Sequence, residues 1–285
     1  MLIQTSFQEQ MENIICLVTR KYPDNIKKIT NSSELKELYY SYLETLQKRK
    51  IEDNDDGLIL TSFDKAFRIS KDFNGGSGVL DDFDQKNNIT LKPIENIEEK
   101  KEQLKEALTF LAEVHDEYYS LLNFMITNIF LFPSEVAAGG SSSTAVGTIW
   151  ANLKEKLSTK DVAEFFIHEL THNCIFIDEH RYGHYDYHII SDESTWATSA
   201  VLLTNRPLDK VLHSIIVSME IILFREKVIG HPQQPKIHPP TEILLNQIKQ
   251  SINSIKTVGK KFPKALSQRS YDLLENVESN LKKIT

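Results

Sequence analysis

The segment from Val162 to Ile177 constrains the fold most, because it is apolar on nearly every side of a helix. Its apolar residues recur at helical spacing along one stripe, and further apolar side chains lie on both sides of that stripe. A helix of this kind is stable only when neighbouring elements cover it all round. The rest of the chain is therefore expected to enclose a buried helix that carries two histidines, His168 and His172.

His168 and His172 lie four residues apart in the sequence His-Glu-Leu-Thr-His. On a helix their imidazoles project from one face and can bind one divalent ion together. Glu169 projects about 100° away, so its carboxylate can reach a metal-bound water or a substrate without being a ligand. The alternative is a chance pattern in which each buried imidazole bonds to a backbone carbonyl. The apolar helix favours the metal, because two buried imidazoles need partners for their nitrogens.

A metal site needs a third protein ligand, and two residues qualify. Glu193 follows His172 by 21 residues, a separation typical of thermolysin-like zinc peptidases, which use two histidines and one carboxylate. Its alternative role is an acid in the first turn of a helix beside Ser191. His213 follows His172 by 41 residues, within an apolar predicted helix. Its alternative role is a core histidine that bonds to Glu220 or to a carbonyl.

The remaining pattern predicts a mainly α (α+β) fold, a helical domain with a small β-sheet next to the buried HExxH helix. Apolar residues at helical spacing predict helices over residues 2–50, 98–131 and 241–285. Alternation over residues 144–152 predicts a strand, along which a substrate peptide can lie.

Residues 52–96 are rich in Asp, Asn and Gly, which predicts an irregular connector. We therefore expect an N-terminal helical region with this connector, residues 1–97, and a metal-binding catalytic region, residues 98–285. Both regions are expected to form one compact body.

Composition narrows the choice of partners. A net charge of −7, from 33 Lys and Arg against 40 Asp and Glu, disfavours general binding to nucleic acid. Two cysteines give no disulfide scaffold. The longest apolar run, residues 215–224, is too short to span a bilayer, and the first 21 residues lack the apolar stretch of an export signal. We expect a cytoplasmic protein without a membrane or nucleic-acid partner.

Four segments occur in an order that is typical of one enzyme family: Gly147–Trp150, Glu164–Asn173, Trp196 and Asn205–His213. This order resembles the HExxH-type α-ketoglutarate-dependent peptide β-hydroxylases, which are found with ribosomally made peptide natural products. The resemblance covers roughly residues 145 to 230. Its specificity lies in the Arg-Pro-Leu and Leu-His elements downstream of the helix motif.

The resemblance implies a non-haem Fe(II) oxygenase that uses α-ketoglutarate and O₂ to hydroxylate a side-chain Cβ of a precursor peptide. The iron ligands it implies are His168, His172 and His213. A cation is also needed for the C5 carboxylate of α-ketoglutarate, with Arg206 as first choice and Arg225 as second. Glu169 would then orient a ligand or the substrate.

Two other functions use the same residues. In a zinc metallopeptidase of the HExxH + Glu type, Glu169 is the general base and Glu193 is the third ligand. In a non-catalytic peptide-binding helical protein, the metal is structural.

The polar aromatic segment from His180 to His188 lies outside the family pattern. Because Gly183 and Asp186 interrupt it, we predict a mobile surface loop that touches the substrate. Its histidines leave an extra metal site as the alternative.

Overall fold

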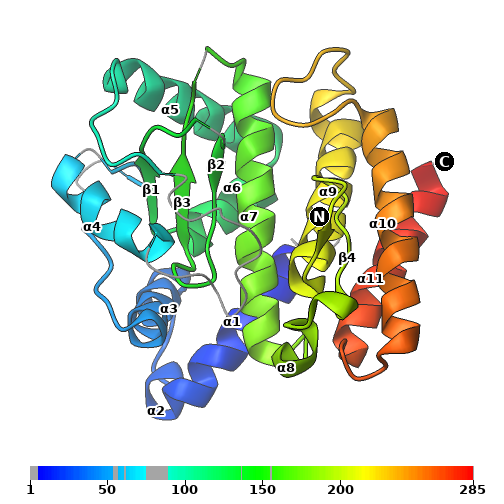
Figure 1. Ribbon diagram of the computed structural model, residues 1–285. Coiled ribbons are helices and arrows are strands. Elements are labelled where there is room, and N and C mark those ends of the chain that lie inside the picture. Colours follow the sequence, from blue (N-terminus) through cyan, green and yellow to red (C-terminus); the bar gives the residue numbers. More distant parts are fainter. Residues whose placement is uncertain are drawn as a thin grey trace. The chain divides into compact units, whose positions relative to one another are not determined.

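The computed structural model describes residues 6–53, 57–60, 62–74, 89–135, 137–154 and 156–284. Helices dominate these residues and two small sheets accompany them, which confirms the mainly α (α+β) fold (Figure 1). The chain divides into two compact units, one of Phe7–Ala163 and the other built from Glu164–Thr285. This division falls inside a helix, at a different position from the boundary predicted between residues 97 and 98.

The unit Phe7–Ala163 combines helices with a three-stranded sheet. Its elements are α1 (Phe7–Lys21), α2 (Pro23–Ile26), α3 (Ser32–Gln47), α4 (Phe63–Asn74), α5 (Ile97–Val114), α6 (Asp116–Met125), β1 (Asn128–Leu131), β2 (Gly139–Gly140) and β3 (Thr148–Ala151). Strand β3 lies between the other two and pairs in parallel with β1 and antiparallel with β2. All four residues of β3 are buried. The strand predicted over residues 144–152 is therefore confirmed in a shorter form.

The helix predicted over residues 98–131 is interrupted at His115 and is wrong for residues 126–131. His115 leaves the helical conformation, with φ −157° and ψ 84°, and its ring accepts a hydrogen bond from the backbone N–H of Tyr118, which starts a new helix. Residues Asn128–Leu131 then form a strand whose residues are all buried. A short, mostly apolar run fits a buried strand as well as a helix, so periodicity alone did not separate the two.

The irregular connector predicted over residues 52–96 contains a helix, α4. Its side chains Ala66 and Ile69 pack in a buried cluster with Phe130, Phe132 and Trp150 of the sheet region. Burial against the sheet stabilises a helix that the surrounding Asp, Asn and Gly residues had obscured. Residues 54–56, 61 and 75–88 of the predicted connector lie outside the described residues.

The unit built from Glu164–Thr285 carries the predicted site. Its elements are α7 (Thr159–Tyr182, which begins in the other unit), α8 (Tyr187–Ile190), the 3-10 helix η1 (Glu193–Thr195), β4 (Ala197–Thr198), β5 (Asn205–Arg206), α9 (Leu208–Phe224), the π-helical turn η2 (Arg225–Ile229), α10 (Thr241–Lys261) and α11 (Gln268–Ile284). Helix α9 packs against α10 and α11 (Figure 1) and is buried at every residue except Lys210. Among the described residues, no helix is both long and apolar enough to cross a membrane.

Helix α7 confirms the predicted buried helix. Every residue from Val162 to Ile177 is buried except His168 and His172, which are partly exposed. The two histidines are therefore the most exposed positions in this stretch.

Candidate metal centre

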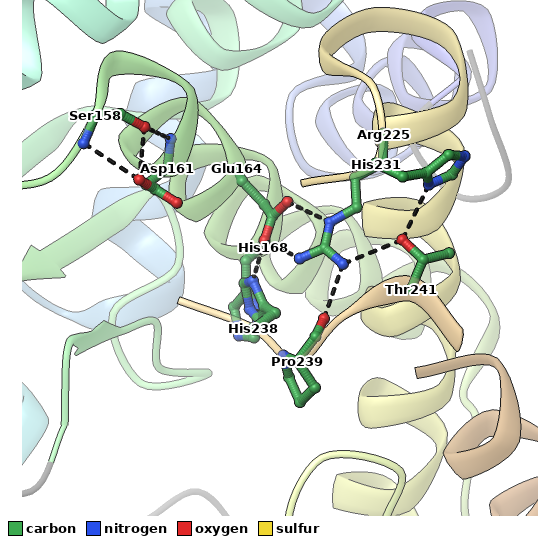
Figure 2. A network of polar contacts seen from close by, with 9 residues as sticks. All are labelled: Ser158, Asp161, Glu164, His168, Arg225, His231, His238, Pro239 and Thr241. Carbon is green, nitrogen blue, oxygen red and sulfur yellow. Dashed lines mark hydrogen bonds and ion pairs between the residues drawn. The ribbon is translucent and has the colours of Figure 1, made fainter. Parts of the chain in front are cut away.

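The first turn of α7 is closed by its own side chains. The Ser158 hydroxyl accepts a hydrogen bond from the backbone N–H of Asp161, and the Asp161 carboxylate accepts bonds from the Ser158 backbone and hydroxyl (Figure 2). This reciprocal pair satisfies N–H groups that a helix start leaves open. The helix is 24 residues long in all, and Glu164, His168 and His172 follow one another at four-residue spacing on one face.

The structure brings the two motif histidines together at their Nε2 atoms, which lie 3.2 Å apart. Two nitrogens that each lie about 2.0–2.1 Å from one ion are roughly 2.8–3.4 Å from each other at ligand angles of about 90–110°. The observed separation falls within that interval. His168 and His172 thus have the spacing of two ligands of one metal ion.

His213, 41 residues after His172, reaches the site from α9. Its Nδ1 atom lies 2.9 Å from Nδ1 of His172, and the two rings stack with a 22° angle between their planes. The predicted third histidine is therefore next to the motif. It contacts His172 at the ring nitrogen that faces away from His168, so the ring has to reorient to share a metal with the two Nε2 atoms.

His238 is a fourth histidine of the site, and it was not predicted as a site residue from the sequence. Its Nε2 atom lies 2.8 Å from Nδ1 of His168, and its side chain is buried. It precedes Pro239 and Pro240 in an irregular segment, so it belongs to no periodic pattern. The only local signal is the proline after it, which restricts the backbone of His238 to extended conformations.

A buried ion pair supports His238. Nδ1 of His238 lies 2.8 Å from Oε1 of Glu164, and the guanidinium of Arg225 binds both carboxylate oxygens of Glu164, at 2.6 and 2.8 Å. Arg225 also donates to the carbonyl of Pro239 and to the hydroxyl of Thr241 (Figure 2). Burial alone would raise the pKa of Glu164, but the hydrogen bonds from His238 and Arg225 outweigh it and lower that pKa. Glu164 is therefore ionised.

This ion pair makes Arg225 unsuitable as the binding partner of the α-ketoglutarate carboxylate. It was the second choice for the α-ketoglutarate carboxylate, yet its guanidinium is fully buried and bonded to Glu164. An arginine that already shares a bidentate bond with a carboxylate has little capacity for a second one.

Arg206, the first choice, lies on β5 and is partly exposed. Its charge acts on two site histidines: burial lowers the pKa of His172 and His213 most, and nearby Lys210 and Arg206 lower it further. The same burial lowers the pKa of His168. All three imidazoles are thus neutral at neutral pH, which is the form that binds metal ions.

The remaining predicted residues separate into two groups. Glu169 is buried, and its Oε1 atom lies 3.9 Å from Nε2 of His168, on the side where the motif nitrogens meet. Glu193 is exposed in the first turn of η1, after Asp192, whose side chain caps that turn. The structure therefore brings Glu169 to the site and gives Glu193 the alternative role of a first-turn acid.

The segment His180–His188 is not a single surface loop. His184 is fully buried and lies 2.7 Å from the carboxylate of Asp178, which also binds Arg269 at 2.5 Å. His180 belongs to the end of α7, and His188 is exposed on α8. The prediction of a mobile loop is wrong for His184, because a buried carboxylate holds its ring.

No known family model and no curated protein sequence matches the chain. The resemblance to the peptide β-hydroxylases therefore stays a prediction.

The nitrogen and oxygen donors near the two motif histidines determine which metal ion can bind there. Among the described residues, no three His, Cys, Asp or Glu side chains are already arranged around one metal position. Two neutral imidazoles do converge, and a third lies 2.9 Å from one of them. Imidazole nitrogen suits zinc and iron, so the residues fit either ion.

Proposed function

We propose that this chain is an Fe(II)- and α-ketoglutarate-dependent oxygenase that hydroxylates the Cβ of a side chain in a ribosomally made peptide. The observation that carries the proposal is the 3.2 Å separation of the His168 and His172 Nε2 atoms on a buried helix. The family resemblance supplies the choice of iron. Bound Fe(II) and α-ketoglutarate would supply the oxidation: one atom of O₂ enters the alcohol and the other enters succinate, with release of carbon dioxide.

In this enzyme, three histidines would bind the metal and one arginine would bind the cofactor. His168 and His172 would hold the metal through Nε2, and His213 would be the third ligand. The rest of the metal's coordination would be left to α-ketoglutarate and O₂. Arg206 would bind the C5 carboxylate of α-ketoglutarate, because it is partly exposed and its charge acts on His172 and His213. Arg225 is assigned to Glu164 instead.

A zinc metallopeptidase is the second candidate, and one observation favours it. The Glu169 carboxylate lies 3.9 Å from Nε2 of His168, so it could take a proton from a water held beside the two histidines. In this version His213 replaces the exposed Glu193 as third ligand. In the oxygenase, the same carboxylate orients a ligand or the substrate.

Anaerobic spectroscopy separates the two functions. The metal-free protein is loaded with Fe(II) without oxygen and titrated with α-ketoglutarate, and the visible absorption band of the Fe(II) chelate is followed. The oxygenase predicts a band that saturates at one α-ketoglutarate per iron. If the band is absent and the zinc-loaded protein instead cleaves a random peptide library, the peptidase function replaces the oxygenase function.

A further inference from the structure

Each ring nitrogen of His168 has its own partner. Nε2 faces His172 at 3.2 Å, and Nδ1 faces Nε2 of His238 at 2.8 Å. A neutral imidazole has one N–H donor and one acceptor nitrogen, so the partner at Nδ1 decides which nitrogen carries the proton. Metal binding at Nε2 requires the proton on Nδ1.

The direction of this chain of hydrogen bonds is set at Glu164. An ionised carboxylate only accepts, so Nδ1 of His238, 2.8 Å from it, must donate. Arg225 binds both oxygens of the same carboxylate, so Glu164 is held on two sides. Nε2 is the ring nitrogen of His238 that is left to face Nδ1 of His168. With Nε2 of His238 as the acceptor, Nδ1 of His168 donates and Nε2 of His168 keeps the lone pair.

Arg225 also fixes the backbone around His238. Its third nitrogen donates to the carbonyl of Pro239 at 2.8 Å and to the hydroxyl of Thr241 at 3.3 Å (Figure 2). These acceptors follow His238 in the chain by one and three positions. One guanidinium thus holds both the carboxylate on α7 and the segment that carries His238, so the ring of His238 cannot drift from His168 without breaking several bonds of a buried ion pair.

We propose that Arg225, Glu164 and His238 are positioning residues that hold His168 as the Nδ1–H tautomer, with Nε2 presented to a metal ion. The inference rests on the proposed metal centre but not on the choice between iron and zinc. Outer partners of this kind typically change metal affinity about 10- to 100-fold when they are removed.

The first test uses metal-free protein, so it is independent of metal binding and activity. Two-dimensional proton–nitrogen NMR on histidine labelled with ¹⁵N reports which ring nitrogen carries the proton. The wild-type protein is expected to show His168 protonated on Nδ1. His238→Ala should lose that preference, and His238→Gln should restore it, because the glutamine amide oxygen can accept from Nδ1. Protonation of His168 on Nε2 in the wild type would overturn the proposal, since a doubly protonated His238 would then be the donor.

The second test measures Zn²⁺ affinity by competition with a chelator. His238→Ala is expected to weaken binding about 10- to 100-fold, with recovery in His238→Gln. His188→Gln is the matched control, because His188 is exposed on α8 and is expected to leave affinity unchanged. Equal affinity in the wild type and His238→Ala would contradict the proposal.

Loss of Glu164 alone can unfold the protein, because it leaves the Arg225 charge buried. The double variant Glu164→Met/Arg225→Met removes both charges and the acceptor at position 164, and it nearly keeps the volume of both side chains. It should fold, lose the Nδ1–H preference of His168 and bind Zn²⁺ more weakly; an unchanged tautomer in the folded variant would overturn the role of this pair. If wild-type protein binds neither zinc nor iron, the proposed function fails, whereas the tautomer of His168 is still measured.

Discussion

Nδ1 of His168 lies 2.8 Å from Nε2 of His238, a residue 70 positions further along the chain. Nδ1 of the second motif histidine, His172, lies 2.9 Å from Nδ1 of His213, the proposed third ligand, whose ring has to reorient to share a metal. Each motif histidine therefore meets another histidine at Nδ1 and the other motif histidine at Nε2. The two convergent Nε2 atoms are the ones that the proposed metal would use, and His238 holds the outer nitrogen of His168.

Replacing His213 tests the proposed third ligand. His213→Ala is expected to abolish the α-ketoglutarate band and to lower Fe(II) affinity at least about tenfold, because two imidazoles alone hold the ion weakly. The fold should persist, as judged by circular dichroism. His188→Ala is the control, since His188 is exposed on α8. Full Fe(II) binding and a normal band in His213→Ala would exclude the three-histidine centre.

Glu169→Gln separates the two enzymes. In the oxygenase, Glu169 is not a proton acceptor for the reaction, so Fe(II) affinity and the α-ketoglutarate band should both be retained. In a zinc peptidase, loss of the general base should reduce peptide cleavage about 10²- to 10⁴-fold. Glu193→Gln is the matched control, and it should change neither metal binding nor turnover because Glu193 is exposed. Loss of metal in Glu193→Gln would restore Glu193 as a ligand.

Arg206 should determine the affinity for α-ketoglutarate. Arg206→Met removes a charge-assisted bond of about 1.5–3 kcal/mol, which corresponds to a roughly 10- to 100-fold higher Kd. Arg206→Lys should recover only part of the loss, because an ammonium cannot bind a carboxylate with a planar fork. The titration is followed by the absorption band. Arg181→Met, at another arginine of the same unit, which lies over the ring of Tyr182, is expected to bind normally. An unchanged Kd in Arg206→Met would contradict the assignment.

The Asp178 cluster should control stability rather than chemistry. Asp178 is fully buried between His184 and Arg269. Asp178→Asn leaves Arg269 without its charge partner and is expected to lower the free energy of unfolding by about 3–5 kcal/mol. Urea denaturation measures this change. The exposed Asp272→Asn should stay within about 0.5 kcal/mol of the wild type.

The same carboxylate gives a pH dependence. Burial would raise the pKa of Asp178, but bonds from His184 and Arg269 lower it overall. Because the folded pKa is below the unfolded value of about 3.9, the stabilisation is complete above that pH and is lost as the pH falls through the folded pKa. The wild-type free energy of unfolding should thus fall more steeply below about pH 4 than that of Asp178→Asn. Parallel pH profiles of the two proteins would show that ionisation of Asp178 does not contribute to the free energy of unfolding.

The sequence correctly predicted the elements whose apolar residues recur at a regular spacing. The HExxH helix, the helix that carries His213 and the short strand β3 all follow from apolar spacing, because burial of one face imposes that spacing. The choice of His213 as a ligand came from the family resemblance instead. His238 does not follow from such spacing, since it lies in an irregular segment whose position depends on Arg225 and Glu164. Likewise α4 is stabilised by contacts with Phe130, Phe132 and Trp150, residues far away in the sequence. Long-range contacts of this kind leave no local pattern.

Metal stoichiometry tests the central claim most directly. Metal-free protein is loaded with Fe(II) under anaerobic conditions, freed of excess ion, and its iron content is determined by mass spectrometry of the element. The account predicts one iron per wild-type chain and almost none in the double variant His168→Ala/His172→Ala, with both proteins folded. Equal iron in the two proteins, or none in the wild type, would contradict a metal centre at these two histidines.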